Sequence, residues 1–311
     1  MVKSAITPEL RALRLALPQK KVRAVIDSDA ATEIDDHFAI SYAIASPDKI
    51  DLQAVVAAPF FKATVSSPEE GMTKSYEAIK MLFSLMDRKS DGVVFKGAPR
   101  FMPDRNTPVD TEGARKIIEL ARKAKEDGEV LYIIAIAALT NVASAIMMAP
   151  DIIGCCTVVW LGGNAVEWYG GNNEYNLRGD LYASQVVFDS GIPLVQFPCQ
   201  MVTDHLITTE PELRARCLEC GKIGEHLYNH SASEMKRWGN DSRVIWDIIT
   251  VAYFCVPDAF ESIIRATPVL NDDKSWDISD CSRPDMRYIY CVRRDRVFKD
   301  MYDRLKKYTS N

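Results

Sequence analysis

Four aspartates between residues 27 and 36 constrain this chain more than any other feature. Asp27 and Asp29 end a short, β-branched apolar run, and Asp35 and Asp36 open a segment whose apolar residues recur at helical spacing. Carboxylates gathered at the end of one strand and the start of the next helix repel one another unless a cation neutralises them. Ca²⁺ and Mg²⁺ do so with oxygen ligands. The stretch therefore predicts a metal site.

A simpler interpretation is that Asp35 or Asp36 caps the helix, because a carboxylate is favourable at the positive end of a helix. That interpretation accounts for one or two of the acids. It leaves Asp27 and Asp29 unexplained, so we favour the metal site.

Strand-like and helix-like segments alternate along most of the 311 residues. This alternation predicts an α/β fold with a doubly wound, mostly parallel sheet flanked by helices. No change of composition marks a linker, and we expect a single domain over residues 1–311. Residues 1–20 have a helical tendency. The expected strands are 22–27, 51–58, 92–95, 130–136, 157–161, 192–197, 262–269 and 287–292. The expected helices are 35–46, 67–87, 111–126, one ending near 150, 179–190, two within 210–238, 242–255 and 294–308.

Composition excludes several classes of protein. The net charge is -5 and no basic stripe is present, so we expect no nucleic-acid partner. We find no signal peptide and no apolar run that would span a membrane. The 8 cysteines are scattered, which is typical of a reducing compartment, and we expect a cytoplasmic protein. Cys217 and Cys220 have the spacing of half a zinc or redox site, but no matching second pair exists.

In a doubly wound sheet the loops after the carboxyl ends of the strands share one crevice. The four aspartates would lie there, together with Thr140-Asn141 and the loops 164–176 and 200–204. Asp247 is one more acid, set between Trp246 and an apolar helix. Burying such a carboxylate is unfavourable unless it is paired, so we expect a metal, a helix cap or a salt bridge there.

Three other chemistries use similar parts. A haloacid-dehalogenase-type phosphatase also begins with a strand and Asp-x-Asp, but it usually has Thr or Val where Ala31 stands. The G-x-G-x-x-G fingerprint of a dinucleotide fold and the nucleophile elbow of a serine hydrolase are both absent from the sequence.

The chain resembles the nucleoside hydrolase family, the inosine–uridine-preferring and related N-ribohydrolases. Five motifs carry the resemblance in the family's order, although the loop between the two aspartate pairs is longer than usual. They are Asp27-Ser28-Asp29 with Asp35-Asp36, Ala137–Asn141, Leu161–Gly163, Asn173–Asn176 followed by Asp180, and Trp246-Asp247.

The resemblance implies hydrolysis of the N-glycosidic bond of a ribonucleoside to ribose and free base. It also implies a homo-oligomer, a dimer or tetramer. Within each active site, Asp29 would hold the attacking water and act as its general base. Ribose hydroxyls would be bound by Asp35, Glu174 and Asn176, and the 5′-hydroxyl by Asn164 or Asn172. The implied Ca²⁺ ligands are Asp29, Asp36, the main-chain carbonyl of Thr140, and Asp247.

Two positions depart from the family. Trp246 stands where the family has a histidine, which protonates the leaving base in some members. Tryptophan cannot act as an acid, although it can stack on a base or form part of the pocket wall. Pro59-Phe60 stands where the family often has Gly-Asn. An aromatic base pocket is one possibility, with Phe60, Trp168, Tyr169 and Tyr175.

These departures leave two alternatives open beside ribonucleoside hydrolysis. One is hydrolysis of another N-ribosyl compound with an easier leaving group, because the histidine is missing. The other is a non-catalytic protein that retains the Ca²⁺ and ribose site.

Overall fold

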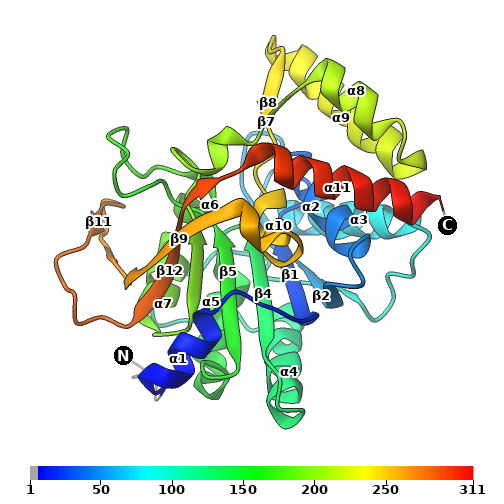
Figure 1. The fold of residues 1–311 in the computed structure, drawn as a ribbon. Helices are drawn as coiled ribbons and strands as arrows, with labels where there is room; N and C mark the ends of the chain where they lie inside the picture. Colours follow the sequence, from blue (N-terminus) through cyan, green and yellow to red (C-terminus); the bar gives the residue numbers. More distant parts are fainter. Residues whose placement is uncertain (1–5, 311) are drawn as a thin grey trace.

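The computed structural model describes residues 6–310, which fold around one eight-stranded sheet (Figure 1). Neighbouring strands are parallel except for the pair formed by the last two in the sheet order. This confirms the doubly wound, mostly parallel sheet. In sheet order the strands are β3 (Val94–Lys96), β2 (Ile50–Ala57), β1 (Val22–Ser28), β4 (Leu131–Ile136), β5 (Cys156–Leu161), β6 (Leu194–Phe197), β12 (Asp285–Val292) and β9 (Phe260–Ala266).

Helices cover both faces of the sheet and enclose a hydrophobic core on each side. The central strands β4 and β5 are buried along their whole length, which is why they read as continuous apolar runs. One core includes α2 (Asp35–Ile44), α3 (Pro68–Leu85), α10 (Ile248–Cys255) and α11 (Arg294–Thr309). The other includes α4 (Glu112–Glu126), α5 (Thr140–Met148) and α7 (Leu181–Asp189).

The helix starts follow local sequence signals. The Ser67 hydroxyl accepts a hydrogen bond from the Glu70 N–H at 3.2 Å and caps α3, while Thr111 caps α4 in the same way. The expected helix over 242–255 is wrong at its start. Ser242–Val244 is a strand, β8, which pairs with β7 (Ile207–Thr209) in a separate ribbon, and the helix begins only at Ile248.

The remaining elements lie around this framework. The expected helices within 210–238 are confirmed as α8 (Glu210–Cys217) and α9 (Gly221–Trp238), which lie side by side at the upper right of Figure 1. Part of the expected helical tendency at residues 1–20 is confirmed by α1 (Pro8–Leu15), whereas residues 1–5 are outside the described range. The short helix α6 (Tyr175–Gly179) was not predicted. Short 3₁₀ turns occupy Pro150–Ile152, Thr203–His205 and Pro257–Ala259.

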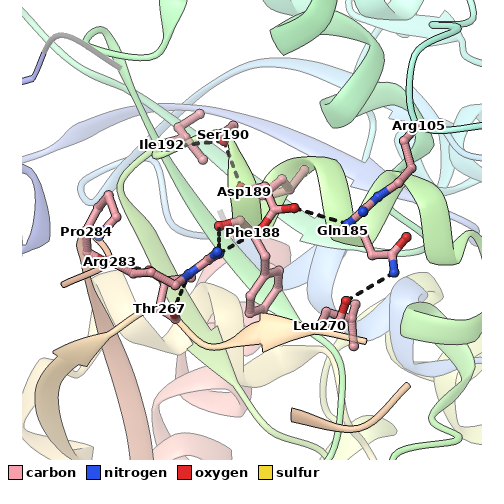
Figure 2. A network of polar contacts seen from close by, with 11 residues as sticks. Arg105, Gln185, Phe188, Asp189, Ser190, Ile192, Thr267, Leu270, Arg283 and Pro284 are labelled. Atoms are coloured by element: carbon pink, nitrogen blue, oxygen red, sulfur yellow. Dashed lines mark hydrogen bonds and ion pairs between the residues drawn. The ribbon is translucent and has the colours of Figure 1, made fainter. Parts of the chain in front are cut away.

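A polar network attaches the segment between β9 and β12 to helix α7 (Figure 2). The Arg283 guanidinium donates to the carbonyls of Thr267 at 2.7 Å and Phe188 at 2.8 Å, and forms an ion pair with Asp189. Gln185 donates to the carbonyl of Leu270 at 3.1 Å. These bonds hold the small ribbon of β10 (Val269–Leu270) and β11 (Trp276–Asp277) against the main body.

The sheet changes direction between β1 and β4. From β1 the chain continues outward to β2 and β3, and from β4 it continues the other way to β5 and β6. The loops that leave the carboxyl ends of β1 and β4 therefore run in opposite directions. Open α/β sheets bind their ligands in the crevice between two such loops. The four aspartates lie at this point.

No helix within residues 6–310 is long and apolar enough to cross a membrane. All eight cysteines are free thiols, and Cys217 and Cys220 are buried. Burial of this kind is usual for cysteines that pack as small apolar side chains.

Candidate active site

A hollow of about 290 Å³ lies outside the carboxyl ends of the central strands. A pocket near this size, roughly 300 Å³ and upward, can enclose a small molecule. Eight of the predicted site residues border this hollow. They are Asp29, Asp35, Asp36, Asn164, Glu174, Asn176, Trp246 and Asp247.

The four aspartates of this hollow follow β1, open α2 or precede α10, and none of their carboxylates caps a helix. Ile34 is the residue at the N-cap position of α2, and no side chain caps that helix, so the interpretation of Asp35 or Asp36 as a cap is wrong. Asp247 precedes α10, and its main-chain carbonyl accepts bonds from Thr250, but its carboxylate caps nothing. Their oxygens remain available for a ligand.

Burial raises the pKa of the Asp29, Asp36 and Asp247 carboxyls well above the ordinary value, and repulsion between neighbouring carboxylates raises it further. Burial also raises the pKa of Asp35, although Arg243 and a hydrogen bond from the Trp246 N–H act in the opposite direction. Buried oxygen ligands in mutual repulsion are the donor set that a hard divalent cation stabilises.

Three of these acids form the tightest group. Ligand oxygens of Asp35, Asp36 and Asp247 all lie within 4.8 Å of one another. Two of them belong to the predicted ligand set, while Asp29 borders the same hollow without belonging to this group. The hydroxyl of Thr140 donates to Asp180 at 2.8 Å, and Thr140 is not among the described residues that border the hollow. The full predicted ligand set stays a prediction.

The residues expected to hold the sugar are themselves held by backbone groups. Glu174 caps α6, and its two oxygens accept bonds from the N–H groups of Gly163, Asn176 and Leu177, each at 2.8 Å. The Asn176 side chain donates to the carbonyl of Leu161 at 3.0 Å. These bonds fix the orientation of both side chains at the wall of the hollow.

The two candidates for the 5′-hydroxyl are placed differently. Asn164 borders the hollow, and its amide bonds to the Gly171 carbonyl at 2.9 Å. Asn172 lies behind it, accepting a bond from the Asn164 N–H at 2.6 Å and donating to the Lys274 carbonyl. Asn172 therefore positions Asn164 and does not itself reach the hollow.

Asp27 supports the site from behind, as its place before Asp29 suggests. It is fully buried, and burial raises its pKa to about 7. Its carboxylate accepts a hydrogen bond from the Asn141 amide at 2.8 Å, and Asn141 in turn accepts a bond from the Ala98 N–H. Strand β1, helix α5 and the loop after β3 are joined through this pair.

The structure assigns a role to the long loop 30–34, which sequence reasoning could not place. Both the N–H and the hydroxyl of Thr32 donate to the Asp29 carbonyl, at 2.8 and 2.9 Å. The Lys62 ammonium donates to the carbonyl of Thr32, and Glu33 forms an ion pair with Arg243 at 3.3 Å. The loop thus brings two cations to the border of the acidic site.

A second hollow of about 190 Å³ adjoins the first, and Asp29 and Tyr175 border both. Phe60 and Tyr175 of the suggested aromatic pocket are in place. Trp168 and Tyr169 are exposed and border neither hollow. The other residues around the second hollow are Pro59, Phe61, Phe101, Ala138, Arg178 and Gly179.

Sequence reasoning missed Lys62, Arg178 and Glu33 as residues of these hollows. The sequence positions of Lys62 and Arg178 could have indicated that these two residues border the hollows. Lys62 follows β2 by a few residues at the ligand-binding edge, and Arg178 lies between the matched Asn176 and Asp180. Nothing in the local sequence distinguishes Glu33 from a solvated loop acid.

The fold and this hollow define a doubly wound α/β protein with a buried carboxylate site at the point where the strand order reverses. The family model for inosine-uridine preferring nucleoside hydrolases matches residues 24–275. The chain belongs to this family, whose members are N-glycosyl hydrolases.

Individual comparisons agree with the family assignment. The pyrimidine-specific ribonucleoside hydrolase RihB of Escherichia coli O1:K1 / APEC is 25% identical over 174 residues, which cover 53% of each chain. The chain thus spans about half the length of the curated relatives it matches.

Solved structures share the fold over nearly the whole chain. The purine-preferring ribonucleoside hydrolase from Gardnerella vaginalis has a TM-score of 0.74 at 18% identity, covering 92% of this chain and 99% of its own. The type III effector protein XopQ, solved in complex with adenosine diphosphate ribose, has a TM-score of 0.68 at 14% identity, covering 98% and 100%.

Proposed function

We propose that this chain hydrolyses the N-glycosidic bond of ribonucleosides, giving ribose and a free base, in a reaction that depends on Ca²⁺. The observation that carries the proposal is the first hollow, where four buried carboxylates face amide and carboxyl groups suited to a sugar. The family match supports the reaction class.

The residues present fit a Ca²⁺ ion. Asp36 and Asp247 would hold it with Asp29 and the main-chain carbonyl of Thr140, and the raised pKa of the three carboxyls reflects a donor set that lacks a balancing charge. Oxygen donors of this number and type suit Ca²⁺. When bound, the ion supplies the positive charge that orients ribose hydroxyls and favours ionisation of a water molecule.

The chain's own groups perform the other tasks. Asp29 lies between the two hollows and accepts the proton of the attacking water. Cleavage of an N-glycosidic bond passes through a transition state with positive charge on the ribose ring. Carboxylates already fixed around the sugar, such as Asp35 and Glu174, stabilise that charge without further rearrangement.

This chain lacks the histidine that protonates the leaving base in some family members, and Trp246 takes its position. Trp246 borders the first hollow and is half-buried, so its indole can stack on a base or donate one N–H bond. It cannot protonate the base. We therefore expect the rate of hydrolysis to depend on how readily the base leaves as an anion.

A substrate panel tests the proposal. Ribose release is measured for inosine, guanosine, adenosine, uridine, cytidine and nicotinamide riboside, with Ca²⁺, with excess chelator, and after Ca²⁺ is restored. We expect release from at least one riboside, loss with chelator and recovery with Ca²⁺. Absence of release across the panel would refute ribonucleoside hydrolysis.

The same panel separates the two alternatives. Turnover of nicotinamide riboside without turnover of inosine would support a substrate with an easier leaving group. A Ca²⁺-dependent rise of melting temperature with ribose, without any turnover, would support a binding protein. We further propose a cytoplasmic homo-oligomer, a dimer or tetramer, which light scattering on the purified protein and fractionation of cells would test.

A further inference from the structure

Two cations at the junction of the hollows have no carboxylate partner within ion-pair distance among residues 6–310. The Lys62 ammonium donates to the Thr32 carbonyl and lies 5.7 Å from the centre of the Phe60 ring. The Arg178 guanidinium lies 5.3 Å from the centre of the Tyr175 ring. Lys62 borders the first hollow and Arg178 the second.

The phenol beside Arg178 also lacks a hydrogen-bond partner among the described residues. Tyr175 borders both hollows, and its hydroxyl is buried with no hydrogen-bond partner among the described residues. A buried polar atom of this kind is uncommon unless a ligand or water completes it. Together with the two cations, it marks the junction as a surface that meets a polar group of a ligand.

Neutralisation of the acidic site explains the position of Lys62 but not that of Arg178. Lys62 lowers the pKa of Asp29 and Glu33, so it does offset part of the acidic charge. Arg178 is exposed, and the described group on which it acts is the Tyr175 phenol. A cation that served only to balance the buried acids would be placed among them, whereas Arg178 faces the aromatic hollow.

The walls of the second hollow suit a flat, partly polar group. Phe60, Phe61 and Phe101 supply ring surfaces, and Arg178 supplies donors in a planar fork. A ribonucleoside has two parts, a polar sugar and a flat base. The acidic first hollow suits the sugar and, beside Trp246, one side of the base, and the adjoining aromatic second hollow suits the rest of the base.

We propose that Arg178, together with Lys62 beside the Phe60 ring of the second hollow, stabilises the negative charge that develops on the departing base, a role that rests on the proposed function and replaces the missing acid. The bond from the anomeric carbon to the base nitrogen breaks, and both electrons pass to the base. The water oxygen bonds to the anomeric carbon, its proton passes to Asp29, and the base leaves as an anion that solvent later protonates.

This arrangement selects a substrate class. A guanidinium donates well to carbonyl oxygens, as in its contacts with oxo-purines. Bases whose carbonyl oxygens share the developing charge, such as hypoxanthine and uracil, fit Arg178. A base with an amino group at the position of that carbonyl presents a donor where Arg178 needs an acceptor.

The test compares a poor with a good leaving group. Inosine releases a basic anion, whereas p-nitrophenyl riboside releases a stable one that needs little help. In Arg178→Gln we expect kcat for inosine to fall about 100-fold, which is typical for loss of one charge-stabilising donor. With p-nitrophenyl riboside we expect a change of less than about threefold, because the leaving group carries its own stabilisation. Lys62→Met should show the same selectivity, and Arg178→Lys should restore part of the inosine rate.

Two matched controls separate this role from a structural one. Arg214 lies 5.1 Å from the Tyr228 ring and Lys80 lies 5.1 Å from the Tyr76 ring, and neither borders either hollow. Arg214→Gln and Lys80→Met should leave both rates unchanged. Melting temperatures of all variants confirm folding.

The outcomes are distinguishable. If the natural protein hydrolyses both ribosides and the Arg178 and Lys62 variants lose equal fractions of both rates, the charge-stabilising role is overturned while the proposed function stands. A rise in KM alone, with kcat for inosine unchanged, would also overturn it. If the natural protein hydrolyses neither these two ribosides nor any riboside of the substrate panel, the proposed function itself fails.

Discussion

Arg243 and Glu33 form an ion pair at 3.3 Å that joins strand β8 to the loop between the two aspartate pairs. Arg243 also pairs with Glu234 of α9, and its side chain is 4% exposed. The same guanidinium lowers the pKa of Asp35 at the start of α2. A single buried cation therefore links β8 and α9 to the wall of the first hollow.

Replacing Arg243 by methionine should loosen this link. The substitution removes the cation and leaves two acids facing one another, so we expect a loss of about 1–3 kcal/mol in the free energy of unfolding. KM for the ribonucleoside should rise because Asp35 loses its support. Urea denaturation and steady-state kinetics measure the two effects. Arg122→Met is the control, since the Arg122–Asp151 pair is exposed and should contribute less than about 1 kcal/mol. Equal losses in the two variants would contradict the assignment.

Removing one acid should have opposite effects with and without Ca²⁺. Asp247→Asn relieves repulsion among buried carboxylates, so in chelator the variant should melt at the same temperature as the natural protein or higher. The increase in melting temperature on adding Ca²⁺ should disappear, because a ligand has been lost. Scanning calorimetry with and without Ca²⁺ measures both.

Asp180 provides the contrast for this experiment. Its buried carboxylate accepts bonds from the N–H groups of Met102 and Ala183 and from the Thr140 hydroxyl. Asp180→Asn should therefore lower the melting temperature in chelator and keep the Ca²⁺-dependent increase. A Ca²⁺ response retained in Asp247→Asn would remove Asp247 from the ligand set.

Histidine protonation should destabilise the fold in mild acid. His226 bonds to His37 at 2.8 Å between ring nitrogens, and burial followed by the nearby His230 lowers the pKa of His226 to about 4 from 6.5. Between pH 6.5 and 4 the unfolded chain binds the proton more readily than the folded one, so stability falls as the pH decreases through this window.

The variant His226→Gln lacks this titration. Its melting temperature should decrease less between pH 6.5 and 4 than that of the natural protein, whereas exposed His205→Gln should follow the natural profile. Parallel profiles for the natural protein and His226→Gln would show that the His37–His226 contact does not contribute.

Gly71 permits a close approach that shapes the second hollow. A Cβ added at this position in α3 would lie 2.3 Å from the carbonyl oxygen of Phe60. Gly71→Ala should therefore cost about 1–3 kcal/mol in unfolding free energy and displace Phe60, lowering activity. At Gly154 the nearest atom is 3.9 Å away, so Gly154→Ala should change stability by less than about 1 kcal/mol. Denaturant titration of the two variants provides the comparison.

Much of the fold was readable from periodicity. The strands β1, β4 and β5 are apolar because both of their faces are covered, and the N-caps Ser67 and Thr111 mark the starts of α3 and α4. The helix expected from residue 242 was wrong because Ser242–Val244 gains cross-strand bonds from β7, a partner distant in sequence. Local patterns contain no information about that pairing.

The candidate site also contains residues that local sequence patterns indicate and residues that only the tertiary structure reveals. The aspartates were identifiable because several carboxylates close together at the end of one strand and the start of the next helix are unusual in a sequence. The distinction between Asn164 and Asn172 depends on a loop whose hydrogen bonds no spacing rule predicts. The contributions of Lys62, Glu33 and Arg178 depend on tertiary proximity to Thr32, Arg243 and Tyr175.

Ca²⁺ titration of metal-free protein tests the central claim most directly. Chelator-treated protein is dialysed, Ca²⁺ is added in steps, and bound metal and ribose release from the best ribonucleoside are measured in the same samples. We predict that activity rises in proportion to bound Ca²⁺ and reaches its maximum at one ion per chain. Full ribose release from protein that contains no metal would contradict the account.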